Sequence, residues 1–296
     1  MLFDKLIWLR HQLNKQLIGN ILPASWFGPK PPPHKQLTLA TEPLHLQIVS
    51  HCWQYAHMLN FQLSSIINYP PKHLKITYTL YHSDEDLNLK LLIARVDKIT
   101  VPNVTWNWVE ITRAQLFRRA IGRNRSALST QADWIWFSDC DLIFHKGCLD
   151  SVAAAVKSCQ HRMVFPQQEF VTELLDASHP MLNQNNEANV DIDISLFKTN
   201  AITKAKGAFQ IVHGDVARTC GYCRDMKMYQ TPMQRWSKTY EDSIFRQLIA
   251  SEGTPVAIEG LYRIRHIEKG RYARDSHIST LRRNIRVATD DSSNQV

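Results

Sequence analysis

The sequence has no apolar run approaching the roughly eighteen residues that a membrane-spanning helix needs. Its N-terminus also lacks a small-residue cleavage site behind an apolar core, so we expect neither a spanning helix nor a secretion signal. The six cysteines, at positions 52, 140, 148, 159, 220 and 223, are scattered without a disulfide framework. Together these absences predict a cytoplasmic protein in a reducing environment.

A paired zinc-binding pattern is also missing. Cys220-Gly-Tyr-Cys223 is a lone C-x-x-C, so two incidental thiols are favoured over a zinc site. Repeats and low-complexity blocks are absent apart from the prolines of Gly28-Pro-Lys-Pro-Pro-Pro33, which we interpret as a stiff connector. We therefore divide the chain into an N-terminal segment (1–36), one large domain (37–272) and a basic polar tail (273–296).

The composition is that of a globular protein with a substantial core. Of the 296 residues, 44% are hydrophobic and 21% are charged, which excludes a disordered or fibrous chain. The formal net charge of +8 predicts an anionic partner. Nucleic acid, a nucleotide diphosphate and an acidic membrane surface all satisfy that condition.

Leucines spaced by threes and fours predict an amphipathic helix in the first two dozen residues: Leu2, Leu6, Leu9, Leu13 and Leu17. Basic residues lie between them, and Trp8 and Trp26 are of the type that settles at a lipid headgroup boundary. The helix can therefore rest on the inner face of a membrane. Packing against the protein's own body or a partner chain is an equal alternative.

From residue 44 onward, short apolar runs alternate with helical patterns. Strands are expected near 44–50, 74–81, 105–111, 134–137, 163–165, 209–212 and 256–264, and helices near 55–67, 113–124, 149–156 and 240–250. A polar stretch at 174–190 is expected to be a loop that can fold over a ligand. Repeated strand and helix in this order predicts an α/β fold with a mainly parallel central sheet and helices on both faces.

The stretch Ala132-Asp-Trp-Ile-Trp-Phe-Ser-Asp-Cys-Asp-Leu-Ile-Phe144 combines an apolar strand with two carboxylates, Asp139 and Asp141. In open α/β sheets, ligands bind at the carboxyl ends of the strands. Two neighbouring acids are costly to bury unless a cation shares them. The pattern therefore favours a divalent metal beside a phosphate-bearing substrate. A helix-capping acid next to a turn acid is the alternative.

Beyond the two acids, Ile121-Gly-Arg-Asn-Arg-Ser-Ala-Leu-Ser-Thr-Gln-Ala-Asp-Trp-Ile-Trp-Phe-Ser-Asp-Cys-Asp141 resembles family-2-like glycosyltransferases of the GT-A fold. In that family an Arg-Asn pair ends a helix, and a polar turn, an apolar strand and Asp-x-Asp follow. Gly207-Ala-Phe-Gln-Ile-Val-His-Gly214 and Tyr240-Glu-Asp-Ser-Ile-Phe-Arg246 resemble the family's donor-sugar strand and Glu-Asp motif. The resemblance covers roughly residues 44–272, and departs from the family's Pro-Thr turn at Ser50-His51.

This resemblance implies a GT-A domain with an Mn²⁺ or Mg²⁺ ion held by Asp141, by Asp139 through water, and by His266. It also implies that the following residues contact the donor: Ser50, His51, Asp84, Arg123, Asp139, Phe209, Lys269 and Arg271. For Asp139, a contact with the ribose hydroxyls is the alternative to binding the metal through water. A metal bridging two phosphates stabilises the charge of the leaving diphosphate. An acceptor hydroxyl must lose a proton to a carboxylate within reach, for which Asp242 is the candidate base and Glu241 its orienting neighbour.

Two features of the sequence compete with these roles. A Glu-Asp pair also suits the N-terminus of any helix. Val190-Asp-Ile-Asp-Ile194 is a second Asp-x-Asp, in which Asp191 and Asp193 are acceptor-side or structural residues and the main rivals for the metal.

The leading interpretation is an inverting, metal-dependent glycosyltransferase that uses a UDP-sugar on a glycan or lipid-linked acceptor in cell-surface polysaccharide synthesis, peripheral to the membrane. A sugar-phosphate nucleotidyltransferase would carry a glycine-rich phosphate loop after the first strand, and Ile48-Val-Ser-His-Cys-Trp53 contains no glycine. A nucleic-acid-binding protein would gather basic residues and stacking aromatics on one surface. Here the aromatics lie in apolar strands and the basic residues are dispersed, so no nucleic acid is expected.

Overall fold

The computed structural model describes residues 22–40, 42–176, 178–182, 189–234 and 239–266, together with six isolated positions: Leu9, Leu13, Leu17, Thr280, Arg283 and Asn284. The expected N-terminal helix lies outside the described residues apart from its three described leucines, and Lys269 and Arg271 lie outside them too. Among the described residues, no helix is both long and apolar enough to cross a membrane.

A seven-stranded sheet forms the centre of the molecule, in the order β10-β6-β9-β4-β1-β2-β3. Its strands are β1 (Leu44–His51), β2 (Leu74–His82), β3 (Val104–Glu110), β4 (Trp134–Phe137), β6 (Met163–Pro166), β9 (Gln210–His213) and β10 (Thr254–Val256). Strand β9 alone runs antiparallel to its neighbours β4 and β6, and the other pairs are parallel. The mainly parallel sheet is therefore confirmed.

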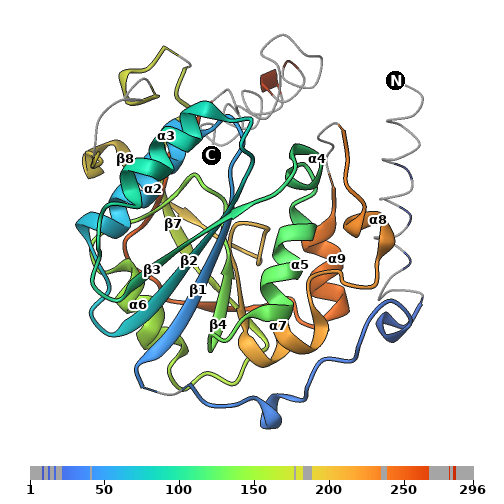
Figure 1. The fold of residues 1–296 in the computed structure, drawn as a ribbon. Coiled ribbons are helices and arrows are strands. Elements are labelled where there is room, and N and C mark those ends of the chain that lie inside the picture. The colour runs from blue at the N-terminus through green and yellow to red at the C-terminus, as the bar shows by residue number, and fades with distance from the viewer. Residues whose placement is uncertain are drawn as a thin grey trace.

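Helices cover both faces of this sheet, as expected (Figure 1). On one side lie α2 (Ala56–Asn68), α3 (Leu87–Val96) and α6 (Cys148–Val156), and on the other α5 (Arg119–Ser129), α7 (Gly214–Cys220) and α9 (Glu241–Leu248). Shorter helices are α4 (Arg113–Leu116) and α8 (Lys227–Gln230), with 3₁₀ turns at Ala24–Trp26, His34–Gln36, Pro180–Leu182 and Ile194–Leu196.

A second sheet of four strands lies beside the first, in the order β5-β11-β7-β8. Its members are β5 (Leu142–Phe144), β7 (Gln168–Thr172), β8 (Phe197–Ala201) and β11 (Leu261–Arg263). The strand expected at 134–137 is confirmed as β4, and residues 138–141 join it to β5 in the second sheet. The Asp-x-Asp pair therefore lies in the turn between the two sheets.

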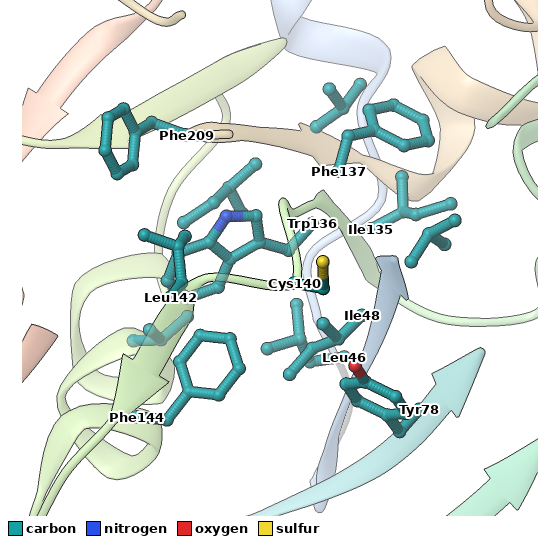
Figure 2. Close-up of a cluster of buried hydrophobic side chains, with 14 of the residues drawn as sticks. Leu46, Ile48, Tyr78, Ile135, Trp136, Phe137, Cys140, Leu142, Phe144 and Phe209 are labelled. Atoms are coloured by element: carbon teal, nitrogen blue, oxygen red, sulfur yellow. The ribbon is translucent and has the colours of Figure 1, made fainter. Parts of the chain in front are cut away.

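The core explains why β4 is apolar throughout. Every residue of β4 is buried, because β1 and β9 flank the strand and helices cover its faces. Trp136, Phe144, Ile48 and Leu46 meet in this core (Figure 2). Ring contacts such as Trp136 with Phe144, whose centroids are 5.1 Å apart, fill the space between the sheets.

Two boundaries differ from the sequence expectation. The helix expected at 113–124 is broken between α4 and α5, because Arg118 adopts the extended angles φ −118° and ψ 82°. The strand expected at 256–264 divides into β10 and β11, which belong to different sheets. Gly260, at φ +66°, makes the turn between them, where a Cβ atom would lie 2.8 Å from the carbonyl oxygen of Lys146.

Candidate active site

The Asp-x-Asp turn lies at the carboxyl edge of the central sheet. The backbone N–H of Ser138 donates to Val49 at the end of β1 (2.9 Å), which holds the turn against the neighbouring strand. Asp141 is buried at 3% exposure, whereas the side chain of Asp139 retains 18%. The two carboxylates therefore lie at the sheet edge where α/β proteins bind ligands.

Gln62 of α2 holds this turn in place through hydrogen bonds to its backbone. Its amide nitrogen donates to the carbonyl oxygens of Asp139 and Leu142, both at 2.9 Å. Its amide oxygen accepts from the hydroxyl of Ser50 at 3.1 Å. Gln62 has no exposed surface, and sequence reasoning missed it; the available signal was a polar residue on the apolar face of a helix. Ser50, an expected donor contact, is likewise buried, and its hydroxyl donates to Gln62.

Cys140, between the two acids, points into the core (Figure 2). It lies beside Cys52, and burial followed by the contact with Cys140 raises the pKa of the Cys52 thiol well above its ordinary value. Cys140 is 1% exposed and belongs to the hydrophobic core, so it anchors the turn between the two acids. Cys140 therefore has a packing role.

Two arginines on one face of α5 meet the carboxylates. Arg119 forms an ion pair with Asp139, and Arg123 lies 3.6 Å from the same oxygen. Each guanidinium is also 3.9 Å from Glu241. Although burial opposes the charged form of Arg119, Asp139 and Glu241 raise its pKa above the ordinary value, so this residue stays charged.

Arg123 is completely buried, with its guanidinium enclosed by aromatic rings. It donates to the carbonyl oxygen of Gly207 (2.8 Å) and to the hydroxyl of Tyr222 (2.9 Å). Its Cζ atom lies 5.2 Å from the Tyr222 ring and 5.8 Å from the Phe137 ring. Arg123 thus connects the Asp-x-Asp region to residues 207–210, part of the segment that is expected, from the family resemblance, to lie beside the donor sugar.

Glu241 and Asp242 begin α9 at the same edge. Glu241 is 3% exposed and faces the two arginines described above. Asp242 lies beside Gly207, where a Cβ atom built on the glycine would be 3.8 Å from its carboxylate oxygen. The backbone oxygen of Asp242 accepts from Gln210 at 3.0 Å. The structure therefore brings the Glu-Asp pair, residues 207–210 and Asp139 together.

A third cation, missed in the sequence, comes from β11. Arg263 stands opposite Leu142 in the strand register, next to Asp141. Its Nε and Nη2 atoms donate to Glu169 at 2.8 and 2.6 Å, and Glu169 is 1% exposed. Burial opposes the charged form of Arg263, but Glu169, then Asp141 and Asp139, raise its pKa. No sequence pattern links positions 141, 169 and 263, because the contact depends on the second sheet.

The remaining expected donor contacts have separate surroundings. His51 stacks on Tyr81, with ring centroids 4.9 Å apart. Asp84 is exposed in the turn after β2. Phe209 is buried at 3% exposure, with the guanidinium of Arg263 5.8 Å from its ring centroid. Their roles toward a ligand stay predictions.

The expected metal ligands can be compared with the chemistry of a divalent ion. Among the described residues, no three His, Cys, Asp or Glu side chains lie close enough together to hold a metal by themselves. His266 is 3% exposed and its ring contacts Tyr55, with centroids 5.3 Å apart. Mg²⁺-type ions at phosphate-transfer sites need only one or two carboxylates, because water and substrate phosphates supply the other ligands. The oxygen donors of Asp139 and Asp141 fit that requirement.

The second Asp-x-Asp has a different location. Asp193 accepts from the backbone N–H of Ser195 and so caps a 3₁₀ turn. Asp191 accepts from the hydroxyl of Tyr69 at 2.5 Å, and this bond raises the pKa of Tyr69 to about 12. Tyr69 ends α2 near the amino end of β2, the sheet edge opposite Asp139. These contacts give Asp191 and Asp193 structural roles.

A polar cleft of about 800 Å³ opens between the beginnings of α2 and α3, beside the turns that follow β1 and β2. It is lined by Gln54, Ala56, His57, Asn60, Glu85, Asp86, Leu87, Asn88, Leu91, Leu92 and Arg95. Two of the lining residues are joined by a hydrogen bond from Arg95 to Asn60 (2.8 Å). The cleft adjoins the Asp-x-Asp edge because the same strand ends border both.

No protein-family model matches the chain, and no curated protein sequence matches it. Among solved structures, it is similar to residues 1–349 of TarS from S. aureus, at 12% identity and a TM-score of 0.42 over 75% of this chain and 60% of that one. It is also similar to the mannosyltransferase PcManGT from Pyrobaculum calidifontis, solved in complex with GDP-Man and Mn²⁺. That similarity has 12% identity and a TM-score of 0.44, over 88% of this chain and 66% of that one. The chain thus spans less than two thirds of the length of each. Because both TM-scores are below 0.5, evidence for the chemistry has to come from the residues of this chain's own site.

Proposed function

We propose that the chain is a metal-dependent, inverting glycosyltransferase that transfers a sugar from a nucleotide-diphosphate donor to a glycan or lipid-linked acceptor. The observation that carries this proposal is the meeting of Asp139, Arg119 and Glu241 at the carboxyl edge of a mainly parallel sheet. Carboxylates for a cation, guanidinium groups for phosphates and a neighbouring carboxylate for a proton are the three needs of this reaction.

The two acids of the turn divide the donor-side work. Asp141 is the candidate direct ligand of Mn²⁺ or Mg²⁺, because its carboxylate follows β4 at the carboxyl edge of the central sheet, where α/β proteins bind ligands. Asp139 is already paired with Arg119, which suits a water-mediated contact with the metal or a contact with the ribose. His266 is the candidate third ligand. A bound ion would supply charge stabilisation for the departing diphosphate.

Asp242 is the candidate base. Its position beside Gly207 places a carboxylate next to the segment proposed to border the donor sugar. Glu241, facing Arg119 and Arg123, fixes the start of α9 and so orients Asp242. In an inverting transfer, such a carboxylate takes the proton of the attacking hydroxyl as the new glycosidic bond forms.

UDP is our first choice for the nucleotide of the donor. The proposed site of action is the inner face of the membrane. The membrane contact is assigned to the N-terminal segment, whose leucines Leu9 and Leu13 are each 49% exposed. A sugar-phosphate nucleotidyltransferase is the alternative activity. It is disfavoured because no glycine occurs between β1 and α2.

Thermal unfolding with nucleotide ligands tests the function. A ligand that binds only the folded state raises the unfolding midpoint, so UDP- or GDP-sugars should do so for the wild-type chain, and more strongly with Mn²⁺. Asp141→Asn should lose the Mn²⁺-dependent part of the shift together with sugar transfer.

Asp225→Asn is the matched control, because Asp225 is exposed and, among the described residues, its ion pair is with its neighbour Arg224. It should behave as the wild type. Full Mn²⁺-dependent binding and transfer by Asp141→Asn would refute the metal assignment, and no shift with any nucleotide would refute the proposed function.

A further inference from the structure

Arg118, at the N-terminus of α5, is a buried charge that the donor-side chemistry leaves unused. It is 4% exposed, and its Nε and Nη1 atoms have no hydrogen-bond partner within the described chain. Its Nη2 atom meets the thioether of Met233. A buried guanidinium without an anion costs several kcal/mol, since it gives up hydration without compensation.

The helix end itself has the same character. Helix α5 runs for 11 residues, has no side-chain cap, and carries no acidic residue in its first turn. Helix N-termini bear a partial positive charge and exposed backbone N–H groups, so they favour anions. Here Arg118 and Arg119 add two full positive charges to that end. The uncapped helix and the unpaired guanidinium are independent observations that indicate the same kind of ligand.

The two arginines serve different sides of the site. Arg119 is paired with Asp139, whereas no carboxylate lies within 4.0 Å of Arg118 in the described chain. Its side chain contacts Met233, which follows α8. Burial opposes the charged form of Arg118, and Glu241 of α9 and Tyr229 of α8 favour it. Arg118 therefore lies on the side of α8 and α9, where the acceptor hydroxyl would lose its proton.

We propose that Arg118 and the N-terminus of α5 bind a carboxylate or phosphate group carried by the acceptor. This inference rests on the proposed glycosyltransferase function and narrows its substrate to an anionic acceptor, such as a uronic acid or a phosphate-bearing glycan or lipid. A guanidinium with free Nε and Nη1 donors presents two N–H groups in a fork that matches two oxygens of such an anion.

Binding of three sugars that share one ring tests the proposal: glucuronate, glucose 6-phosphate and glucose. The full chain is first saturated with UDP and Mn²⁺, so that the donor side is filled. The two anionic sugars should then raise the unfolding midpoint further, and neutral glucose should not. Arg118→Met should weaken anion binding about tenfold or more, the loss expected for one charge-assisted contact, and leave UDP binding unchanged.

Two variants control for charge and fold. Arg118→Lys should retain part of the anion binding, and Arg125→Met, at an exposed position on the same helix, should retain all of it. Equal anion binding by wild type and Arg118→Met, or no binding by the wild type, would overturn the proposal. A large fall in the midpoint of ligand-free Arg118→Met would also overturn it, because the guanidinium would then already be satisfied.

The measurements with UDP distinguish a failure of the anion-site proposal from a failure of the proposed glycosyltransferase function. Anion binding that disappears once UDP is present would assign the Arg118 site to the donor and overturn its assignment to the acceptor. If no nucleotide binds but glucuronate binds through Arg118, the glycosyltransferase proposal fails and the anion site stands.

Discussion

Asp139 and Asp141 are two positions apart but lie in different electrostatic surroundings. Asp139 is held by Arg119 and is partly exposed. Asp141 is buried next to Arg263, whose own charge is fixed by Glu169. Each acid therefore has a guanidinium group of the chain beside it, Arg119 for Asp139 and Arg263 for Asp141. This distinction supports separate roles for the two acids toward a donor.

Asp242→Asn tests the assignment of the base at the level of one atom. The amide preserves the size of the side chain but cannot take a proton, so transfer should fall by about 10²-fold or more while the nucleotide-induced midpoint shift is retained. Transfer rate and donor binding should be measured on the same preparation.

Glu252→Gln serves as the control for that variant, because the side chain of Glu252 is 73% exposed and pairs with Arg246 in the last turn of α9. It should leave transfer unchanged. Loss of donor binding in Asp242→Asn would show that the residue is structural.

Sequence reasoning found the acids but missed their supports, for a physical reason. Asp139, Asp141, Glu241 and Asp242 are recognisable because their spacing along the chain reflects the chemistry. Gln62, Glu169 and Arg263 act through contacts between residues more than 75 positions apart. Such contacts exist only once the two sheets are assembled, and no local pattern encodes them.

At the scale of elements, α5 approaches the sheet closely enough to require glycine. A Cβ atom on Gly122 would lie 2.2 Å from Nε2 of His51 and 2.8 Å from the ring of Tyr81. Contacts this short must displace either the helix or the stacked rings. Since α5 carries Arg119 and Arg123, its position determines how the arginines meet the acids.

Gly122→Ala should therefore destabilise the fold by about 1–3 kcal/mol, the usual range for overpacking. Urea unfolding gives the free energy, and the nucleotide-induced midpoint shift reports any displacement of the arginines. Gly28→Ala is the matched control, because its Cβ would have only one neighbour, at an ordinary 3.9 Å. An unchanged stability of Gly122→Ala would contradict the close packing of α5.

Elements with a clear period were predicted well, and those without one were not. Strands β1, β2 and β3 match the expected ranges within one residue at either end. Strand β8 has one buried residue followed by four exposed ones, so it offered no alternation to detect. The break between α4 and α5 contains neither glycine nor proline, the usual signals for the end of a helix.

For the whole molecule, the alternation of strand and helix was sufficient to predict the α/β class and the parallel sheet. The antiparallel direction of β9 could not be predicted, since residue pattern does not specify strand direction. Likewise, the division of the strands between two sheets depends on tight turns such as that at Gly260.

The N-terminal segment leads to a test on the complete chain. The exposed leucines Leu9 and Leu13, with basic residues between them, should bind vesicles that contain anionic phospholipid. Co-sedimentation should decrease in high salt and with neutral lipid, and should be lost in a variant that lacks residues 1–21. Undiminished binding by that variant would place the membrane contact elsewhere.

The turn at residues 138–141 joins β4 of the seven-stranded sheet to β5, an edge strand of the four-stranded sheet. It is therefore a mechanical joint as well as a site. A cation bound by Asp141 and, through water, by Asp139 would restrain this turn. A small rotation of β5 and β11 against β4 would change the distance between the two carboxylates. Affinity for the donor and the stiffness of the connection between the sheets would then rise and fall together.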